Sequence, residues 1–198
     1  MAQLNLPCGE TEIRALCVGE PALLSGRIIT GRDTAHHWLV GAYREEVAPY
    51  LKGSIIYHCG PVVRKNADGT FDFVAAGPTT SAREEPYQAD VIGRYGLRGV
   101  IGKGGMFDKT RKGLVEHGAV YLHAVGGTAQ SLARAVVRVE RVFKLEEFGV
   151  PEAMWVIEVK DFPTVVTMDA SGGSLHETIS QSSRDVLQKL LGLPSKAG

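Results

Sequence analysis

The chain has few cysteines, and their arrangement excludes two common kinds of stabilising site. Cys8, Cys17 and Cys59 are the three cysteines among 198 residues, an odd number at unrelated spacings. The sequence therefore predicts neither a disulfide framework nor a metal site of the CxxC type. A reducing cytoplasm is the compartment that suits this cysteine usage.

The sequence also lacks an excess of charge and a long apolar run. Lysine and arginine together number 22, as do aspartate and glutamate, so the formal net charge is zero. No general electrostatic field therefore attracts nucleic acid or an anionic membrane, and any attraction for anions must be local. No apolar stretch approaches the roughly 18 residues that span a bilayer, and the N-terminal residues lack the basic and apolar regions of a signal peptide. We expect a cytoplasmic protein that binds neither nucleic acid nor membrane.

Short apolar runs that alternate with helical patterns predict an α/β fold. A length of 198 residues with 44% hydrophobic content suits one domain over residues 1–198, with a loose tail only at 194–198. Runs rich in branched apolar residues predict strands at 22–30, 53–58, 71–76, 98–102 and 119–125. The pattern leaves open whether these strands run parallel.

Three further segments carry specific structural expectations. Ser81 and Glu84 have the spacing of a capping box, which predicts a helix that begins there and ends near Tyr95. Pro163 divides two apolar runs, which predicts a hairpin or two successive edge strands. The C-terminal segment 174–192 predicts a helix with one apolar face formed by Leu175, Ile179, Val186, Leu187, Leu190 and Leu191.

Three basic residues each follow the end of a predicted strand. Arg32 follows the first strand, Arg83 follows the run that ends in "GPTTSA", and Lys103 lies in "GKGG". Ligands of α/β sheets bind beyond the carboxyl ends of the strands, and the hydroxyls of 79–81 lie where a helix begins, a position that favours anions. Three converging cations suit a ligand with two carboxylates, or a phosphate.

A purely structural interpretation of the same residues stays open. Each cation can be a surface or ion-paired residue, and the Thr-Thr-Ser cluster can serve only as turn and cap. The adjacent pair His36 and His37 diverges on a helix, so we expect a helix surface and a capping contact there, not a metal site.

Five segments together resemble one known family. "GRDTAHH", "HCGPVVRKN", "AAGPTTSAR", "IGKGGM" and "GVPEAMWVIEVKDFPTVVTMD" are similar, in order and spacing, to the beta subunit of class I iron–sulfur fumarase and of tartrate dehydratase. The likeness runs from about residue 20 to 170. Two positions depart from the family pattern: Glu84 stands where family members tend to carry Met, and Cys59 where they often carry Ala.

The resemblance implies a swivelling β/β/α domain, with layered sheet and helices, that belongs to a hydro-lyase. Such an enzyme adds water reversibly to fumarate to give malate. The catalytic 4Fe–4S cluster is implied to belong to an alpha subunit, so that this chain binds none alone and works in a hetero-oligomer with that iron–sulfur subunit.

The resemblance also implies roles for four residues. Arg32, Arg83 and Lys103 match the residues that hold the carboxylates of a small dicarboxylate substrate, and Thr79 matches the proposed catalytic base. A threonine hydroxyl is too weak a base unaided, so the role requires activation by neighbouring cations and partner residues.

Two alternatives to the fumarase interpretation remain open at this point. The chain can be the beta subunit of a dehydratase that acts on tartrate or mesaconate, because one hydroxyl or methyl group is sensed by pocket walls that partly belong to the other chain. It can also be a non-catalytic module that binds a dicarboxylate.

Overall fold

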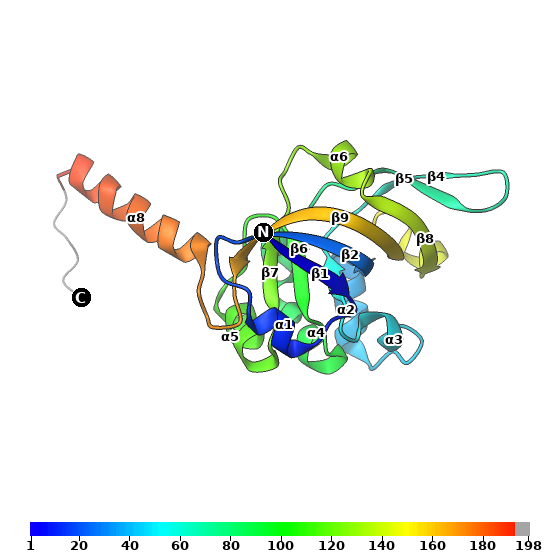
Figure 1. The fold of residues 1–198 in the computed structure, drawn as a ribbon, viewed down its shortest axis with the longest axis horizontal. Helices are drawn as coiled ribbons and strands as arrows, with labels where there is room; N and C mark the ends of the chain where they lie inside the picture. Colours follow the sequence, from blue (N-terminus) through cyan, green and yellow to red (C-terminus); the bar gives the residue numbers. More distant parts are fainter. Residues whose placement is uncertain (193–198) are drawn as a thin grey trace.

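The computed structural model describes residues 1–192, so the predicted tail at 194–198 lies outside the described residues. A curved sheet forms the centre, helices pack below it as drawn, and one long helix and one hairpin project from the body (Figure 1). This arrangement of a layered sheet and helices confirms the predicted α/β class.

The strands and helices alternate along the chain. The strands are β1 (Ala2–Leu6), β2 (Pro21–Thr30), β3 (Ile55–Tyr57), β4 (Val62–Lys65), β5 (Phe71–Ala75), β6 (Gly99–Gly102), β7 (Val120–His123), β8 (Val136–Phe143) and β9 (Met154–Met168). The helices are α1 (Glu10–Arg14), α2 (Asp33–Gly41), α3 (Ala48–Leu51), the 3-10 helix η1 (Ser81–Glu84), α4 (Glu85–Tyr95), α5 (Asp108–His117), α6 (Ala129–Ala133), α7 (Leu145–Phe148) and α8 (Leu175–Leu190).

The main sheet closes on itself. Strands β1, β2, β3, β6 and β7 are parallel neighbours in that order. The long strand β9 runs antiparallel to β7 and also to β2, so the sequence β2–β3–β6–β7–β9 returns to β2. Strand β8 pairs with the N-terminal half of β9. A closed ring leaves its strands few free edges and gathers the carboxyl ends of the parallel strands at one rim.

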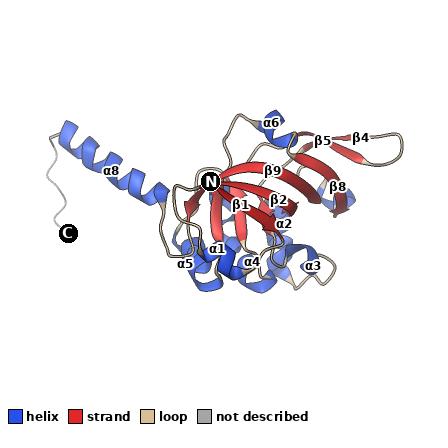
Figure 2. Cartoon of the chain, in the orientation of Figure 1, coloured by secondary structure: helices blue, strands red, loops and turns tan. Residues whose placement is uncertain are grey.

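Alternation along the strands creates two apolar cores. Ile28 belongs to a core formed by residues of all five ring strands, which fills the interior of the ring. The next residue, Ile29, belongs to a second core with residues of α2, α3, α4 and α5, which cover the outside of the ring (Figure 2). Successive strand side chains point to opposite faces, so a single run of isoleucines serves both cores.

The segment around Pro163 differs from the prediction of a hairpin or two edge strands. It is one continuous strand, β9, in which Pro163 lies opposite Leu23 of β2. Pairing with β8 ends at Val159 and pairing with β7 begins at Val165. At Pro163, β9 is therefore paired with β2 on one side and is unpaired on the other. A proline, which lacks the backbone N–H, is tolerated at such a place.

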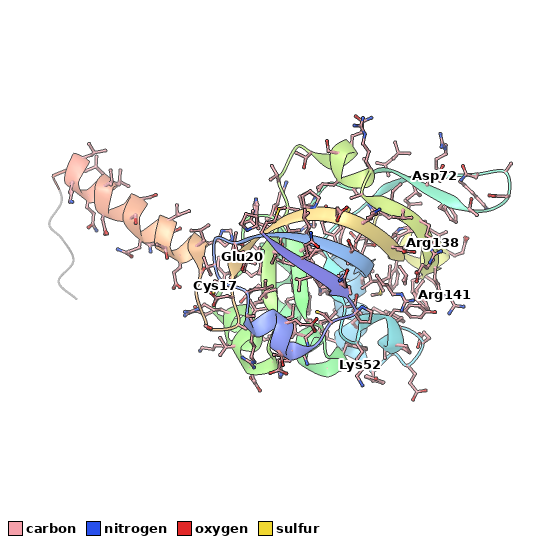
Figure 3. The ribbon with its side chains drawn as sticks, in the orientation of Figure 1. Cys17, Glu20, Lys52, Asp72, Arg138 and Arg141 are labelled. Carbon is pink, nitrogen blue, oxygen red and sulfur yellow. The ribbon has the colours of Figure 1, made fainter. Side chains whose placement is uncertain are left out.

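The predicted strand at 71–76 forms, as β5, but it lies outside the main sheet. It pairs with β4 in a two-stranded hairpin that projects from the body. Asp72, labelled in Figure 3, makes an ion pair of 2.7 Å with Arg64 across this hairpin.

The predicted C-terminal helix forms as α8 and extends away from the body (Figure 1). None of its residues is buried, and its apolar side chains at Ile179, Val186, Leu187 and Leu190 are more than half exposed. An apolar helix face without a partner is typical of an interaction surface. Among residues 1–192, no helix has the length and apolar character needed to cross a membrane.

Candidate functional site

Two of the predicted cations lie at the rim where the parallel strands end. Arg32 comes two residues after Thr30, the last residue of β2, and Lys103 directly follows β6. The strands β2, β3 and β6 run parallel side by side, which the sequence pattern had left open, so their carboxyl ends share this rim, where ligands of α/β sheets bind.

The segment "PTTS" reaches the same rim by a route that the sequence did not reveal. Thr79 N–H donates to the carbonyl of His58 at 2.7 Å, and the N–H of Lys103 donates to the carbonyl of Thr79 at 3.3 Å. Ser81 N–H donates to the carbonyl of Lys103 at 3.1 Å. The segment therefore lies between the ends of β3 and β6. Arg83 follows a strand, β5, as expected, but this strand belongs to the separate hairpin and not to the main sheet.

The threonine hydroxyls do not cap the helix that follows them. The residue before the first helical turn is Thr80, whose side chain accepts no capping bond. Thr79 lies one residue earlier in the extended stretch, half-buried, and its hydroxyl makes no hydrogen bond with any residue in 1–192. We call Arg32, Thr79, Arg83 and Lys103 the strand-end site.

The predicted capping box at Ser81 and Glu84 was also wrong. The Ser81 hydroxyl lies 2.8 Å from Nδ1 of His58 and 2.8 Å from the hydroxyl of Tyr121, and all three groups are buried. His58 Nε2–H in turn donates to the side-chain oxygen of Gln88 at 2.7 Å. Through these two hydrogen bonds, Ser81 fixes the "PTTS" segment to β7 and to the end of β3. Its hydroxyl therefore does not cap the helix.

His36 joins the same buried group, although the sequence predicted a helix surface for it. Its Nε2 lies 2.9 Å from the side-chain oxygen of Gln88, and its Nδ1 lies 2.9 Å from the carbonyl of Arg32. Burial lowers the pKa of His36, and burial together with the neighbouring His36 lowers the pKa of His58 well below its usual value. The two histidines, joined through Gln88, therefore tie the start of α2, with Arg32, to the "PTTS" segment.

Gly102 makes this network possible, since it leaves room for three polar side chains to meet. A Cβ atom there would lie 1.8 Å from Oγ of Ser81 and 3.0 Å from the hydroxyl of Tyr121. We expect Gly102→Ala to lower the free energy of unfolding by about 2–3 kcal/mol, through overpacking and lost buried hydrogen bonds. Urea denaturation followed by circular dichroism measures the loss.

Gly41→Ala is a matched control for this prediction. The nearest atom to its added Cβ is a guanidinium nitrogen of Arg44 at 3.8 Å, an ordinary contact. Equal urea midpoints for the Gly102 and Gly41 variants would show that the network adjusts without cost.

The three cations of the strand-end site differ in their partners. Arg32 lies 3.3 Å from a carboxylate oxygen of Glu152, and Arg83 lies 3.1 Å from one of Asp33. Lys103 makes no ion pair within residues 1–192. Gly60 leaves room for the Arg32 side chain, because a Cβ there would lie 2.6 Å from its Nη1. The site therefore holds three positive and two negative side chains, with a surplus of one positive charge for an anionic ligand.

A hollow of about 410 Å³ is lined by Gly104, the residue after Lys103, and by Arg111, His176 and Arg184, but by none of the four residues of the strand-end site. His123 ends β7 at the same rim, and sequence reasoning did not single it out; its Nδ1 is buried without a partner among residues 1–192. A larger hollow of about 690 Å³, between Tyr43 and Tyr95, lies on the α3–α4 side away from these residues.

The described residues do not form a ligand set for a metal cluster. Within residues 1–192, no group of three or more His, Cys, Asp or Glu side chains is placed to hold a metal ion. Cys8 follows β1, the exposed Cys17 follows α1 (labelled in Figure 3), and Cys59 is buried after β3. Burial raises the pKa of Cys59 to about 12, which disfavours the thiolate that a cluster requires. A 4Fe–4S cluster therefore does not fit the donors of this chain.

Comparison with known families gives one match that covers most of the chain. The family model described as "Fumarase C-terminus" matches residues 1–179. This range contains all four residues of the strand-end site.

Comparison with curated proteins finds related chains in two groups. A putative fumarate hydratase class I of Geobacillus stearothermophilus is 52% identical over 94% of the chain, which spans only 35% of that relative's length. A putative L(+)-tartrate dehydratase subunit beta of Methanocaldococcus jannaschii is 40% identical, with 92% of the chain and 94% of the relative covered. The L(+)-tartrate dehydratase subunit beta of Escherichia coli K12 is 37% identical, with 87% and 85% covered.

Proposed function

The chain belongs to the fumarase C-terminus family, and from this membership we propose that it is the beta subunit of a two-subunit iron–sulfur hydro-lyase that interconverts fumarate and malate. The identity of 52% to a putative class I fumarate hydratase supports the reaction. Near-complete coverage of relatives named as beta subunits supports the division into two chains. The observation that carries the proposal is the strand-end site, where Lys103 is bound through its backbone to Thr79 at the rim that also carries Arg32.

The cations hold the two carboxylates of the substrate. Fumarate carries two negative charges about as far apart as its four-carbon chain allows, so separate cations are needed for its two ends. Arg32 and Arg83 present planar forks that match carboxylate geometry. Lys103, which has no ion-pair partner in residues 1–192, contributes a mobile point charge next to Thr79. The partners Glu152 and Asp33 hold the two arginine forks in place before the substrate binds.

Thr79 transfers the proton in this proposal. Dehydration of malate removes a proton from the carbon next to one carboxylate and hydroxide from the other carbon, and hydration reverses both steps. The Thr79 hydroxyl is half-buried and free of hydrogen bonds within residues 1–192, so it can face that carbon. Lys103 and the nearby arginines stabilise a threonine alkoxide, which an unassisted hydroxyl does not form at neutral pH.

The partner chain supplies what this chain lacks. Since the donors of this chain do not fit a 4Fe–4S cluster, we assign the cluster to the iron–sulfur alpha subunit, which then covers the strand-end rim. The exposed apolar face of α8 is a second surface for that subunit, because stable interfaces between subunits are large and apolar.

A tartrate dehydratase is the second candidate, and one observation favours it. The relatives named as separate beta subunits, at 40% and 37% identity, carry tartrate dehydratase names. Tartrate and malate share both carboxylates, so the strand-end site can bind either, and the walls from the alpha subunit decide on the extra hydroxyl.

A substrate panel tests the proposal. The chain is co-expressed with its iron–sulfur partner, purified without oxygen and assayed against fumarate, L-tartrate and mesaconate. We expect the highest kcat/KM for fumarate, by at least about tenfold, because a missing or extra polar group in a closed pocket costs a few kcal/mol. A maximum for L-tartrate would establish the second candidate. Binding of all three without turnover of any would identify a dicarboxylate-binding module.

A further inference from the structure

Glu84 carries a fully buried carboxyl group that has no role in the proposed function. It ends η1, directly after Arg83, and none of its surface is exposed. Neither of its oxygens has a hydrogen-bond donor within reach among residues 1–192. A buried carboxylate without a donor is among the least favourable groups in a protein interior, so its protonation state requires an explanation.

The polar group beside Glu84 is another carboxylate, that of Asp33 at the start of α2. A hydrogen bond between two carboxyl groups requires that one of them carries a proton. Asp33 is half-exposed and already accepts from Arg83 at 3.1 Å. Full burial and the lack of a donor favour the proton on Glu84.

The other charged groups around Glu84 leave this arrangement intact. Arg83 on η1 is the nearest cation and is engaged by Asp33. On β7, burial raises the pKa of Tyr121, which is therefore a neutral phenol and is bound to Ser81. Glu85 points away, toward the N–H groups of Phe107 and Thr110.

We propose that Glu84 is a positioning residue that holds its proton against Asp33, so that a single negative charge faces Arg83 and leaves its fork able to bind a substrate carboxylate. Loss of that proton would place a second negative charge next to Arg83. The two carboxylates together would then cancel the cation and compete with the substrate. This inference rests on the proposed function, in which Arg83 binds the substrate.

The proton leaves Glu84 within an experimentally accessible range. Burial, and then the charge of Asp33, raise the pKa of Glu84 to about 8. Below that pH the Glu84–Asp33 pair carries one negative charge, and above it two. If only the protonated form binds substrate, KM should rise about tenfold for each unit of pH well above 8.

The first measurement is KM for fumarate in the reconstituted two-subunit enzyme at pH 7 and pH 9. We expect KM of the wild type to rise about tenfold, whereas Glu84→Gln, which keeps the shape and cannot ionise, keeps a KM that changes less than twofold. Glu146→Gln, at an exposed glutamate of α7, is the matched control and should follow the wild type. Equal pH dependence of KM in wild type and Glu84→Gln would overturn the proposal.

The second measurement needs no turnover and separates this proposal from the proposed function. Native Glu84 keeps a proton up to about pH 8 that an unfolded glutamate has released near its ordinary value of 4.5. Stability of the wild-type chain should therefore fall as pH rises between these two values. The melting temperature of Glu84→Gln should exceed that of the wild type by a gap that widens from pH 5 to pH 8 and is then constant.

The outcomes of the two measurements remain distinguishable. A gap that does not change with pH, or that matches Glu146→Gln, overturns the protonated Glu84. The difference in melting temperature can widen with pH while KM of the wild type does not change with pH. That result overturns the positioning role and leaves the hydro-lyase proposal intact. An enzyme that turns over none of the dicarboxylates overturns the proposed function, and the positioning role with it, whatever the melting temperatures show.

Discussion

Thr79→Val should lower kcat of the reconstituted enzyme by about 10³-fold while the affinity for a dicarboxylate inhibitor changes less than about threefold. Valine has nearly the same shape and suits the extended backbone at this position, so it removes the hydroxyl alone. A positioned proton-transfer group contributes about 10²–10⁴-fold, and a loss confined to kcat is the sign of an interaction made with the reacting atoms. Steady-state kinetics with fumarate and the inhibition constant of succinate give both quantities.

The neighbouring Thr80 is the control for this result. It is exposed, and its side chain makes no capping bond, so Thr80→Val should keep kcat within about twofold of the wild type. If the two valine variants had the same activity, Thr79 would have only a structural role and the strand-end site would lack its base.

Arg83→Lys should have the opposite kinetic signature, with a rise in KM of about 30-fold and a smaller loss in kcat. Lysine keeps the positive charge but loses the planar fork that binds a carboxylate through two hydrogen bonds. One charge-assisted hydrogen bond is worth about 2 kcal/mol, which corresponds to about 30-fold in affinity. Initial rates over a range of fumarate concentrations separate the two constants.

Arg64→Lys provides a matched control for Arg83→Lys. Arg64 forms a comparable ion pair with Asp72, at 2.7 Å, on the projecting β4–β5 hairpin (Figure 3). Its substitution should leave KM unchanged. A KM for Arg83→Lys equal to that of the wild type would mean that Arg83 serves only its ion pair with Asp33.

The sequence predicted the bounds of strands and helices better than it predicted which strands pair with one another. The strand predicted at 22–30 is observed at Pro21–Thr30, and the helix that was to end near Tyr95 ends there, followed by Gly96 in the left-handed conformation that closes helices. Periodicity is a local property, and these are local features. The closure of the ring through β9 depends on pairing between residues more than a hundred positions apart, which no local pattern contains.

The same distinction explains what was found and missed at the site. Arg32 and Lys103 follow the ends of strands, as predicted, and they share one rim because β2, β3 and β6 are parallel, which the pattern had left open. The spacing of Ser81 and Glu84 indicated a capping box, but Ser81 bonds instead to His58, a residue 23 positions earlier. Glu84 and His36 are buried by elements that are distant in the sequence. The residues next to them in the chain carry no pattern that predicts this burial.

A titration that follows the rate of fumarate hydration shows whether this chain is one of the two subunits of a hydro-lyase. The purified chain is added, without oxygen, to a fixed amount of its iron–sulfur partner subunit, and malate formation is followed at each step. We expect no turnover from either chain alone, a rate that rises with each addition, and a plateau at a fixed ratio of the two chains. A partner subunit that hydrates fumarate at the full rate alone, or a mixture that never becomes active, would contradict the account.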